Sequence, residues 1–141
     1  MNEGSLLQFV DTNILVYAYD ITASDKHRRA RQLVLDLWES GTGCLSIQVL
    51  QEFYVTATRK IARPLPAFQA AQIISDLSVW PTHSPKADDI LAAIDIQQRY
   101  GIAFWDAMIL ISAMRMGCIT LWSEDLNSGQ TYEQVLVRTP F

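Results

Sequence analysis

The 141-residue chain is predicted to be an α/β protein, a three-layer α/β/α sandwich with a mostly parallel sheet. Half of its residues are hydrophobic, which supplies one sizeable core for a chain of this length and leaves no room for a second. Short apolar runs alternate with longer amphipathic stretches, which indicates strands alternating with helices. Residues 1–141 are therefore expected to form a single domain.

The first half of the chain contains short apolar runs typical of buried strands and longer stretches typical of helices. The expected elements are, in order, a strand over Leu6–Val10, helices over Asn13–Tyr19 and Asp25–Ser40, a strand over Cys44–Ile47 and a helix that ends before Pro64. Ser24 and Ser46 precede two of these helices and are expected to cap them, because a serine hydroxyl can accept from a backbone N–H of the first turn.

The second half continues the alternation. The expected elements are a helix over Ala67–Leu77, an edge strand over Ser78–Thr82, helices over Lys86–Tyr100 and Trp105–Met116, and strands over Cys118–Trp122 and Val135–Arg138. The first of the last two helices is amphipathic through Ala87, Ile90, Leu91 and Ile94. The second is almost wholly apolar and is predicted to be central and buried.

Charge, cysteine content and the length of apolar runs argue against a highly basic nucleic-acid-binding protein, a disulfide-rich or zinc protein, and a membrane or secreted protein. A net charge of −4 and a pI near 5.0 argue against binding nucleic acid through overall charge, but allow carboxylates gathered around cations. Cys44 and Cys118 fit neither a disulfide framework nor a zinc motif and are expected to be buried thiols. No apolar run approaches the roughly 20 residues that span a bilayer, and no signal-peptide pattern is found, so a cytoplasmic protein is expected.

Four carboxylates stand in places that general solubility does not explain. Asp11 follows the first strand and Asp125 follows a later one, and the carboxyl ends of parallel strands meet at one edge of a sheet. Asp106 opens the most apolar helix, and Glu52 lies beside a wide apolar face. Each has an ordinary alternative: a helix cap for Asp11, the helix dipole for Asp106, a side chain reaching solvent for Glu52 and a polar loop for Asp125.

Carboxylates that converge repel one another unless a cation neutralises them. Oxygen ligands without histidine or cysteine favour Mg²⁺ or Mn²⁺ over zinc. Thr12 and Asn13 supply a hydroxyl and an amide that can orient a carboxylate or a water. The chemistry suited to such a site is phosphoryl transfer.

These residues and their order resemble the PIN-domain ribonucleases, particularly the VapC-type toxins of bacterial toxin–antitoxin pairs. Phe9-Val10-Asp11-Thr12-Asn13 resembles the opening motif of the family, Ser46 through Glu52 the second, Phe104-Trp105-Asp106-Ala107 the third and Ser123-Glu124-Asp125 the fourth. The resemblance implies that Asp11 and Asp106 are the principal metal ligands and that Glu52 and Asp125 complete the acidic pocket. Thr12, Asn13, Ser46 and Ser123 are the expected supporting residues.

The resemblance also implies a PIN-like fold and cleavage of RNA within the strand by metal-activated water. It further implies a small cognate antitoxin as partner and a possible homodimer, without naming a particular RNA. One departure is Thr139-Pro140-Phe141, where relatives often end in an Asn-Pro-Phe-like sequence. It concerns the packing of the last strand and no catalytic residue.

Two basic clusters, Lys26–Arg31 and Arg59–Arg63, could contact RNA phosphates or could be solvated helix faces. Besides a nuclease, two other functions are open for this chain, a phosphatase and a catalytically silent module. An aspartyl-nucleophile phosphatase usually has a second acid two residues after the first, where this chain has Asn13. A catalytically silent RNA-binding or protein-interaction module of the same fold would lack metal-dependent cleavage.

Overall fold

The computed structural model describes residues 6–141, which contain six strands and six helices. The strands are β1 (Gln8–Val10), β2 (Gly43–Ser46), β3 (Thr82–His83), β4 (Thr120–Trp122), β5 (Thr131–Tyr132) and β6 (Val135–Arg138). The helices are α1 (Thr12–Tyr19), α2 (Asp25–Ser40), α3 (Ile47–Arg59), α4 (Ala67–Leu77), α5 (Ala87–Tyr100) and α6 (Phe104–Arg115). Residues 1–5 of the expected domain lie outside this description.

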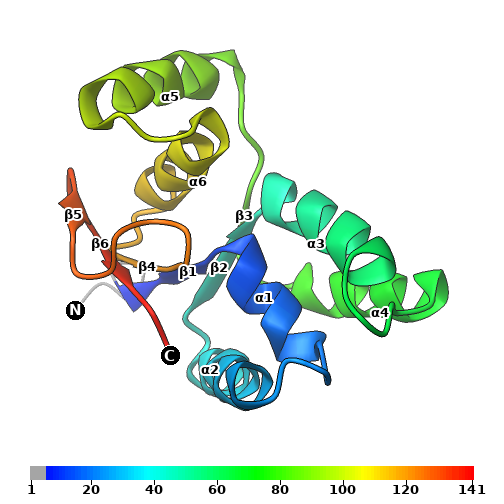
Figure 1. The fold of residues 1–141 in the computed structure, drawn as a ribbon. Coiled ribbons are helices and arrows are strands. Elements are labelled where there is room, and N and C mark those ends of the chain that lie inside the picture. Colours follow the sequence, from blue (N-terminus) through cyan, green and yellow to red (C-terminus); the bar gives the residue numbers. More distant parts are fainter. Residues whose placement is uncertain (1–5) are drawn as a thin grey trace.

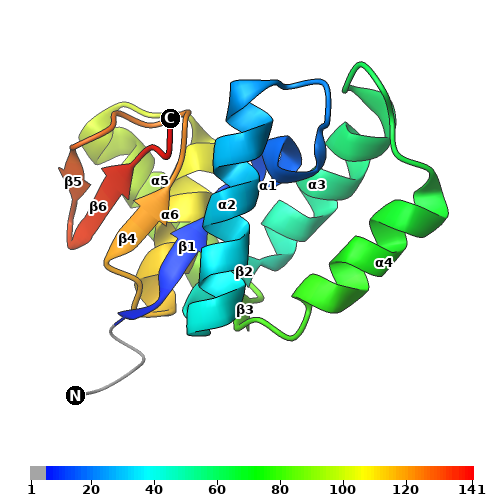
Figure 2. The same cartoon turned by 90° about the horizontal axis from the view of Figure 1, so that it is seen from below.

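The six strands form one sheet in the order β3-β2-β1-β4-β6-β5. All neighbouring pairs are parallel except β5 and β6, which form an antiparallel hairpin. One face of the sheet is covered by α6, with α5 packed on its outer side, and the other by α2, which lies beside α1 (Figures 1 and 2). The predicted three-layer α/β/α sandwich with a mostly parallel sheet is therefore confirmed.

The core is centred on α6, as predicted. Seven consecutive residues of this helix, Ala107–Ala113, are buried, because the helix lies between the sheet and α5. Cys44 and Cys118 are both buried and free, which confirms their expected role as apolar side chains. Within residues 6–141, no helix is both long and apolar enough to cross a bilayer.

Strands β1 and β4 end level with each other. Val10 pairs with Trp122, and the backbone N–H of Asp11 donates to the carbonyl of Trp122 over 2.9 Å. The turns that follow the two strands, which begin at Asp11 and Ser123, therefore start side by side. This register brings residues more than 100 positions apart in the sequence to the same edge of the sheet.

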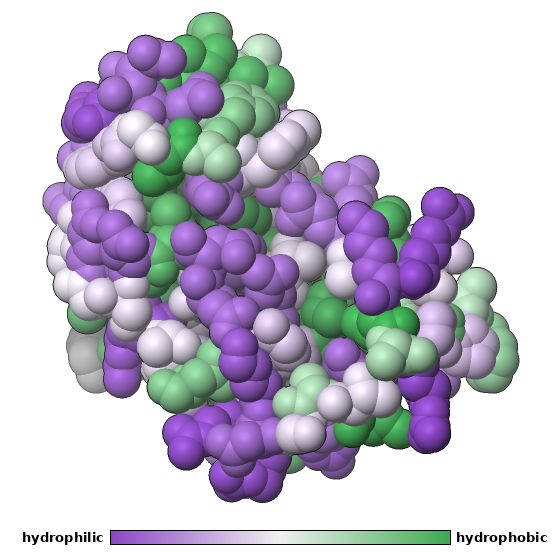
Figure 3. Space-filling view, in the orientation of Figure 1, coloured by the Kyte–Doolittle hydropathy of each residue, from purple (hydrophilic) through white to green (hydrophobic). Residues whose placement is uncertain are grey.

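The apolar stripe expected on α5 faces outward. Ile90, Leu91 and Ile94 are 43%, 65% and 43% exposed, while Asp89, Ala93 and Ile96 are buried against the rest of the molecule. Apolar atoms accordingly reach the surface at the top of Figure 3, over α5. Asp89 can lie inside because it accepts from the backbone N–H of Lys86 over 2.9 Å and from Arg115 over 2.8 Å.

Three smaller expectations were wrong. The edge strand is Thr82–His83, because residues 78–80 form a turn at the end of α4 that buries Trp80 against Gly43. Ser24 precedes α2 but makes no side-chain cap bond, since its backbone is in an unusual conformation with φ of 54°. The short strand β5 was not predicted, since its two residues carry no periodic pattern.

Candidate active site

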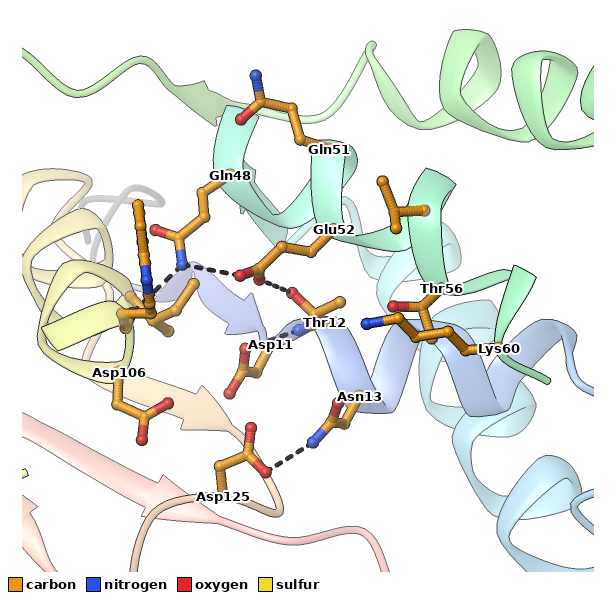
Figure 4. A pocket seen from close by; sticks show the side chains of 13 residues that line it. Asp11, Thr12, Asn13, Gln48, Gln51, Glu52, Thr56, Lys60, Asp106 and Asp125 are labelled. Atoms are coloured by element: carbon orange, nitrogen blue, oxygen red, sulfur yellow. Dashed lines mark hydrogen bonds between the residues drawn. The ribbon is translucent and has the colours of Figure 1, made fainter. Parts of the chain in front are cut away.

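The turns after β1 and β4 border a pocket of about 410 Å³ at the carboxyl edge of the sheet (Figure 4). The four carboxylates singled out in the sequence, Asp11, Glu52, Asp106 and Asp125, all line it. They come from the start of α1, the middle of α3, the first turn of α6 and the loop after β4. The remaining lining residues are Thr12, Asn13, Gln48, Gln51, Val55, Thr56, Lys60, Trp105 and Ile109.

Asp11 is the most deeply placed of the four, with 3% of its surface exposed. It caps α1: one carboxylate oxygen accepts from the backbone N–H of Thr12 over 2.7 Å, and the other accepts from the hydroxyl of Ser123 over 2.8 Å. The pKa of Asp11 is raised to about 7: burial is the largest cause, the charges of Asp125 and Asp106 add to the rise, and the two hydrogen bonds oppose it. Asp11 therefore has both roles that the sequence allowed: it caps α1, and it lines the acidic pocket.

Glu52 is held from two sides. The hydroxyl of Thr12 donates to its Oε1 over 2.6 Å, and the amide of Gln48 donates to its Oε2 over 3.4 Å. The same amide nitrogen donates to the carbonyl of Trp105 over 3.3 Å, so Gln48 joins α3 to the start of α6. The Oε1 atom of Gln48 is buried and has no partner among the described residues.

Asp106 and Asp125 are the other two carboxylates of the pocket. Burial and the charges of Asp125 and Glu52 raise the pKa of Asp106. Partial burial and the charges of Glu124 and Glu52 raise the pKa of Asp125, against a 2.7 Å hydrogen bond from the Asn13 amide that lowers it. Burial is the largest cause of the raised pKa of Asp11, Asp106 and Asp125, and the charges of neighbouring carboxylates add to it.

The donor chemistry of the pocket fits a hard divalent cation. Its acidic side chains offer only oxygen ligands, and both causes that raise the pKa of three of them, first burial and then the charges of neighbouring carboxylates, are ones that a bound cation would offset. Within the described part of the chain, no three acidic, histidine or cysteine side chains are already arranged to hold a metal ion.

Comparison with known proteins identifies the family. The model of the PIN domain matches residues 9–133, which include all four carboxylates. The chain belongs to the PIN-domain family. A comparison with curated protein sequences found no match.

Solved structures share the fold of this PIN domain. The VapC20 toxin of Mycobacterium tuberculosis, described as cleaving the sarcin–ricin loop, superposes with a TM-score of 0.62 at 19% identity, over 83% of this chain and 88% of the toxin. A toxin–antitoxin complex from Klebsiella pneumoniae gives 0.66 at 22% identity, over 95% and 98% of the two chains. DNA-bound VapBC from Salmonella typhimurium gives 0.65 at 15% identity, over 96% and 99%. At these identities the likeness concerns the fold.

The expected supporting residues of the PIN domain divide into two groups. Thr12, Asn13 and Ser123 each donate to one of the carboxylates, and Ser123 also accepts from the backbone N–H of Asp125 over 3.1 Å. Ser46 lies outside the pocket lining: it is fully buried and caps α3 by accepting from the backbone N–H of Val49 over 3.3 Å. Its contribution to the site is to fix the start of the helix that carries Glu52.

The α3 face of the pocket includes two residues that were not predicted, Gln48 and Thr56. They lie four residues before and four residues after Glu52, a spacing that places them on the same face of the helix. Lys60, the C-cap residue of α3, follows four residues after Thr56 and belongs to the basic cluster expected as a phosphate contact. In the basic cluster 59–63, Lys60 alone lines the pocket.

In the other basic cluster, Lys26–Arg31, three of the basic side chains form ion pairs. Lys26 forms an ion pair with Glu124, and Arg28 and Arg29 both pair with Asp25 on the same helix.

Proposed function

We propose that this PIN domain is a metal-dependent endoribonuclease that serves as the toxin of a VapBC-type toxin–antitoxin pair. The observation that carries the proposal is the convergence of Asp11, Glu52, Asp106 and Asp125, from four separate segments, on one pocket of a PIN domain. The similar structures support it, since one is described as a toxin that cleaves the sarcin–ricin loop, one as a toxin–antitoxin complex and one as DNA-bound VapBC.

In this proposal Asp11 and Asp106 hold a Mg²⁺ or Mn²⁺ ion, and Glu52 and Asp125 complete the acidic pocket directly or through water. Such an ion would activate a water for attack on phosphorus and offset charge on the phosphate oxygens. The hydroxyl of Ser123 and the N–H of Thr12 fix both oxygens of Asp11. The Thr12 hydroxyl holds Glu52, and Asn13 holds Asp125, so hydrogen bonds orient three of the four acids, Asp11 included.

The proposed partners are RNA as substrate and a small cognate antitoxin as inhibitor, and the resemblance to VapC-type toxins leaves a homodimer open. The bacterial cytoplasm is the expected location, since both RNA and antitoxin would be met there. Size-exclusion chromatography with light scattering tests the homodimer independently of activity.

The deciding experiment incubates purified, antitoxin-free protein with structured RNAs in Mg²⁺ or Mn²⁺. We expect cleavage by the wild type, no cleavage in chelator, and losses of at least about 100-fold in Asp11→Asn and Asp106→Asn. Asp36→Asn is the matched control, because Asp36 is an exposed aspartate of α2 outside the pocket. Cleavage that survives both pocket substitutions would contradict the assignment of the ligands.

The alternative is a catalytically silent RNA-binding or interaction module. Calorimetric titration with Mn²⁺ separates the two. Binding that requires Asp11 supports the nuclease, and absent binding together with absent cleavage supports the silent module.

A further inference from the structure

Helix α3 and its C-cap residue, Lys60, present a row of side chains to the pocket, and the cation of Lys60 ends the row. Gln48, Glu52, Thr56 and Lys60 follow one another at intervals of four residues and all line the pocket. Lys60 lies 12 residues beyond Gln48, which corresponds to about 18 Å along the helix axis. Gln48 and Lys60 therefore mark opposite ends of the pocket, with Glu52 between them.

The ammonium group of Lys60 is available to an anion. It forms no ion pair and no side-chain hydrogen bond with any residue from 6 to 141, although four carboxylates line the same pocket. Figure 4 shows its nitrogen directed into the pocket, toward Thr12 and away from the helix end. A cation held over an acidic pocket but paired to none of the acids can bind a phosphate that approaches them.

The pocket opens into a second hollow beyond Lys60. Asn13, Thr56 and Lys60 also line a second hollow of about 420 Å³, which extends between α1 and α3 toward residues 20–23. The two hollows therefore share one wall at Lys60. A polynucleotide strand, unlike a small substrate, needs such an open groove on more than one side of the reacting atoms.

The opposite end of the pocket carries an exposed aromatic ring. Trp105 directly precedes Asp106 and is 61% exposed, although it opens the most buried helix of the molecule. Its position is fixed, because Gln48 donates to its carbonyl and its ring forms an edge-to-face pair with Phe104 at 5.1 Å between centroids. An indole held in water beside a catalytic pocket is a stacking surface for a nucleic-acid base.

We propose that Trp105 and Lys60 position RNA across the carboxylates, Trp105 by stacking on one base and Lys60 by contacting a phosphate on the other side of the cleaved bond. This inference rests on the proposed function, since it takes RNA as the ligand. It makes the two side chains positioning residues, outside the group that would hold metal. It also requires the stacked base to be unpaired, because a base in a duplex has no free face.

The test measures binding of a short fluorescent single-stranded RNA by anisotropy, in EDTA and in Ca²⁺. Trp105→Ala is expected to weaken binding by about 5- to 150-fold, and Trp105→Phe to retain most of it. Lys60→Gln is expected to reduce the slope of log affinity against log salt by about 0.7, the value for one phosphate contact on a single strand. Lys60→Arg should keep the slope, and the same RNA as a duplex should bind at least about tenfold more weakly.

Two matched controls separate these contacts from general effects. Phe68→Ala removes an exposed aromatic of α4, and Arg59→Gln removes a neighbouring charge, both outside the pocket lining. Variants of Trp105 and Lys60 that bind like the wild type, controls that weaken binding equally, or no RNA binding in either buffer would overturn the proposal. In Mg²⁺, both pocket variants should raise KM more than they lower kcat, whereas a merely structural role would also lower the melting temperature.

Failure of this inference is distinguishable from failure of the proposed function. Cleavage that depends on Asp11 but is unaffected by Trp105→Ala and Lys60→Gln leaves the nuclease and removes the positioning roles. RNA binding that depends on both residues, without any cleavage, keeps the contacts and removes the nuclease.

Discussion

Asp11 combines burial, a capping role and two acidic neighbours, so its protonation affects the stability of the fold. Its folded pKa of about 7 lies above its ordinary value of 3.8. The folded state therefore keeps a proton that the unfolded state has lost, and the stability of metal-free protein should fall as pH rises through this interval. The full effect is on the order of 2–4 kcal/mol, because each pKa unit corresponds to about 1.4 kcal/mol and relaxation reduces the sum.

Asp11→Asn should remove this dependence of stability on pH. The amide can still accept from Thr12 and can donate to Ser123, but it carries no charge. In EDTA at about pH 8, this variant should melt at a higher temperature than the wild type, and the difference should shrink toward about pH 5. Thermal unfolding followed by circular dichroism measures it, with Asp36→Asn as the control. A wild type whose melting temperature rises with pH would contradict the prediction.

At the scale of elements, the loop that carries Asp125 is tied to two helices. Glu124 pairs with Lys26 of α2 and accepts from the hydroxyl of Tyr17 of α1 over 3.0 Å, while Asp125 accepts from Asn13. The ion pair is partly exposed, so its contribution to stability is small, below about 1 kcal/mol. Its main effect is to hold the loop beside the other carboxylates.

Lys26→Met should therefore lower RNA cleavage several-fold while changing the melting temperature little. The substitution keeps the aliphatic stem of the side chain and removes the charge that holds Glu124. Arg28→Met is the control, because within residues 6–141 Arg28 forms its ion pair inside α2, with Asp25. Equal losses of activity in the two variants would indicate a general charge effect on RNA binding and no specific role for the loop.

Helix α5 is attached through a buried carboxylate as well as through apolar side chains. Asp89 accepts from the N–H of Lys86 and from Arg115 of α6, and its Oδ2 lies 3.4 Å from Nε2 of His83. Asp89→Ala is expected to lower the free energy of unfolding by about 1–3 kcal/mol, since it removes a cap bond and a charge-assisted bond. Urea denaturation measures this loss. Asp88→Ala, at an exposed neighbour, should cost much less, and similar losses would contradict the assigned role of Asp89.

At the scale of the whole molecule, metal binding should be coupled to folding. The pocket is assembled from four distant segments, so the unfolded chain has no equivalent site. Mn²⁺ at about 100 times its dissociation constant should stabilise the wild type by about 2.7 kcal/mol relative to EDTA, and Asp11→Asn or Asp106→Asn should abolish the gain. Differential scanning fluorimetry measures the shift. An unchanged melting temperature across a wide range of Mn²⁺ would contradict a metal site.

The candidate site was partly visible in the sequence, because its acids break local patterns. Asp11 and Asp125 follow strands, and Asp106 opens an apolar helix, so strand order and helix composition were enough to single them out. The hydrogen-bond partners of these acids could not be predicted from local sequence. Thr12 contacts Glu52 across 40 residues, and Ser123 contacts Asp11 across 112, and no local pattern encodes such distances.

Local sequence patterns were enough to predict the α/β class, the central buried helix and the positions of the candidate carboxylates, because hydrophobic periodicity and strand ends are local properties. Tertiary structure alone decided which face of α5 is buried, since periodicity identifies an apolar face but not whether another element covers it. It likewise decided that Trp105 and Lys60 border the same pocket. Their proximity depends on how α3 and α6 pack beside β2, and packing depends on contacts between residues far apart in the chain.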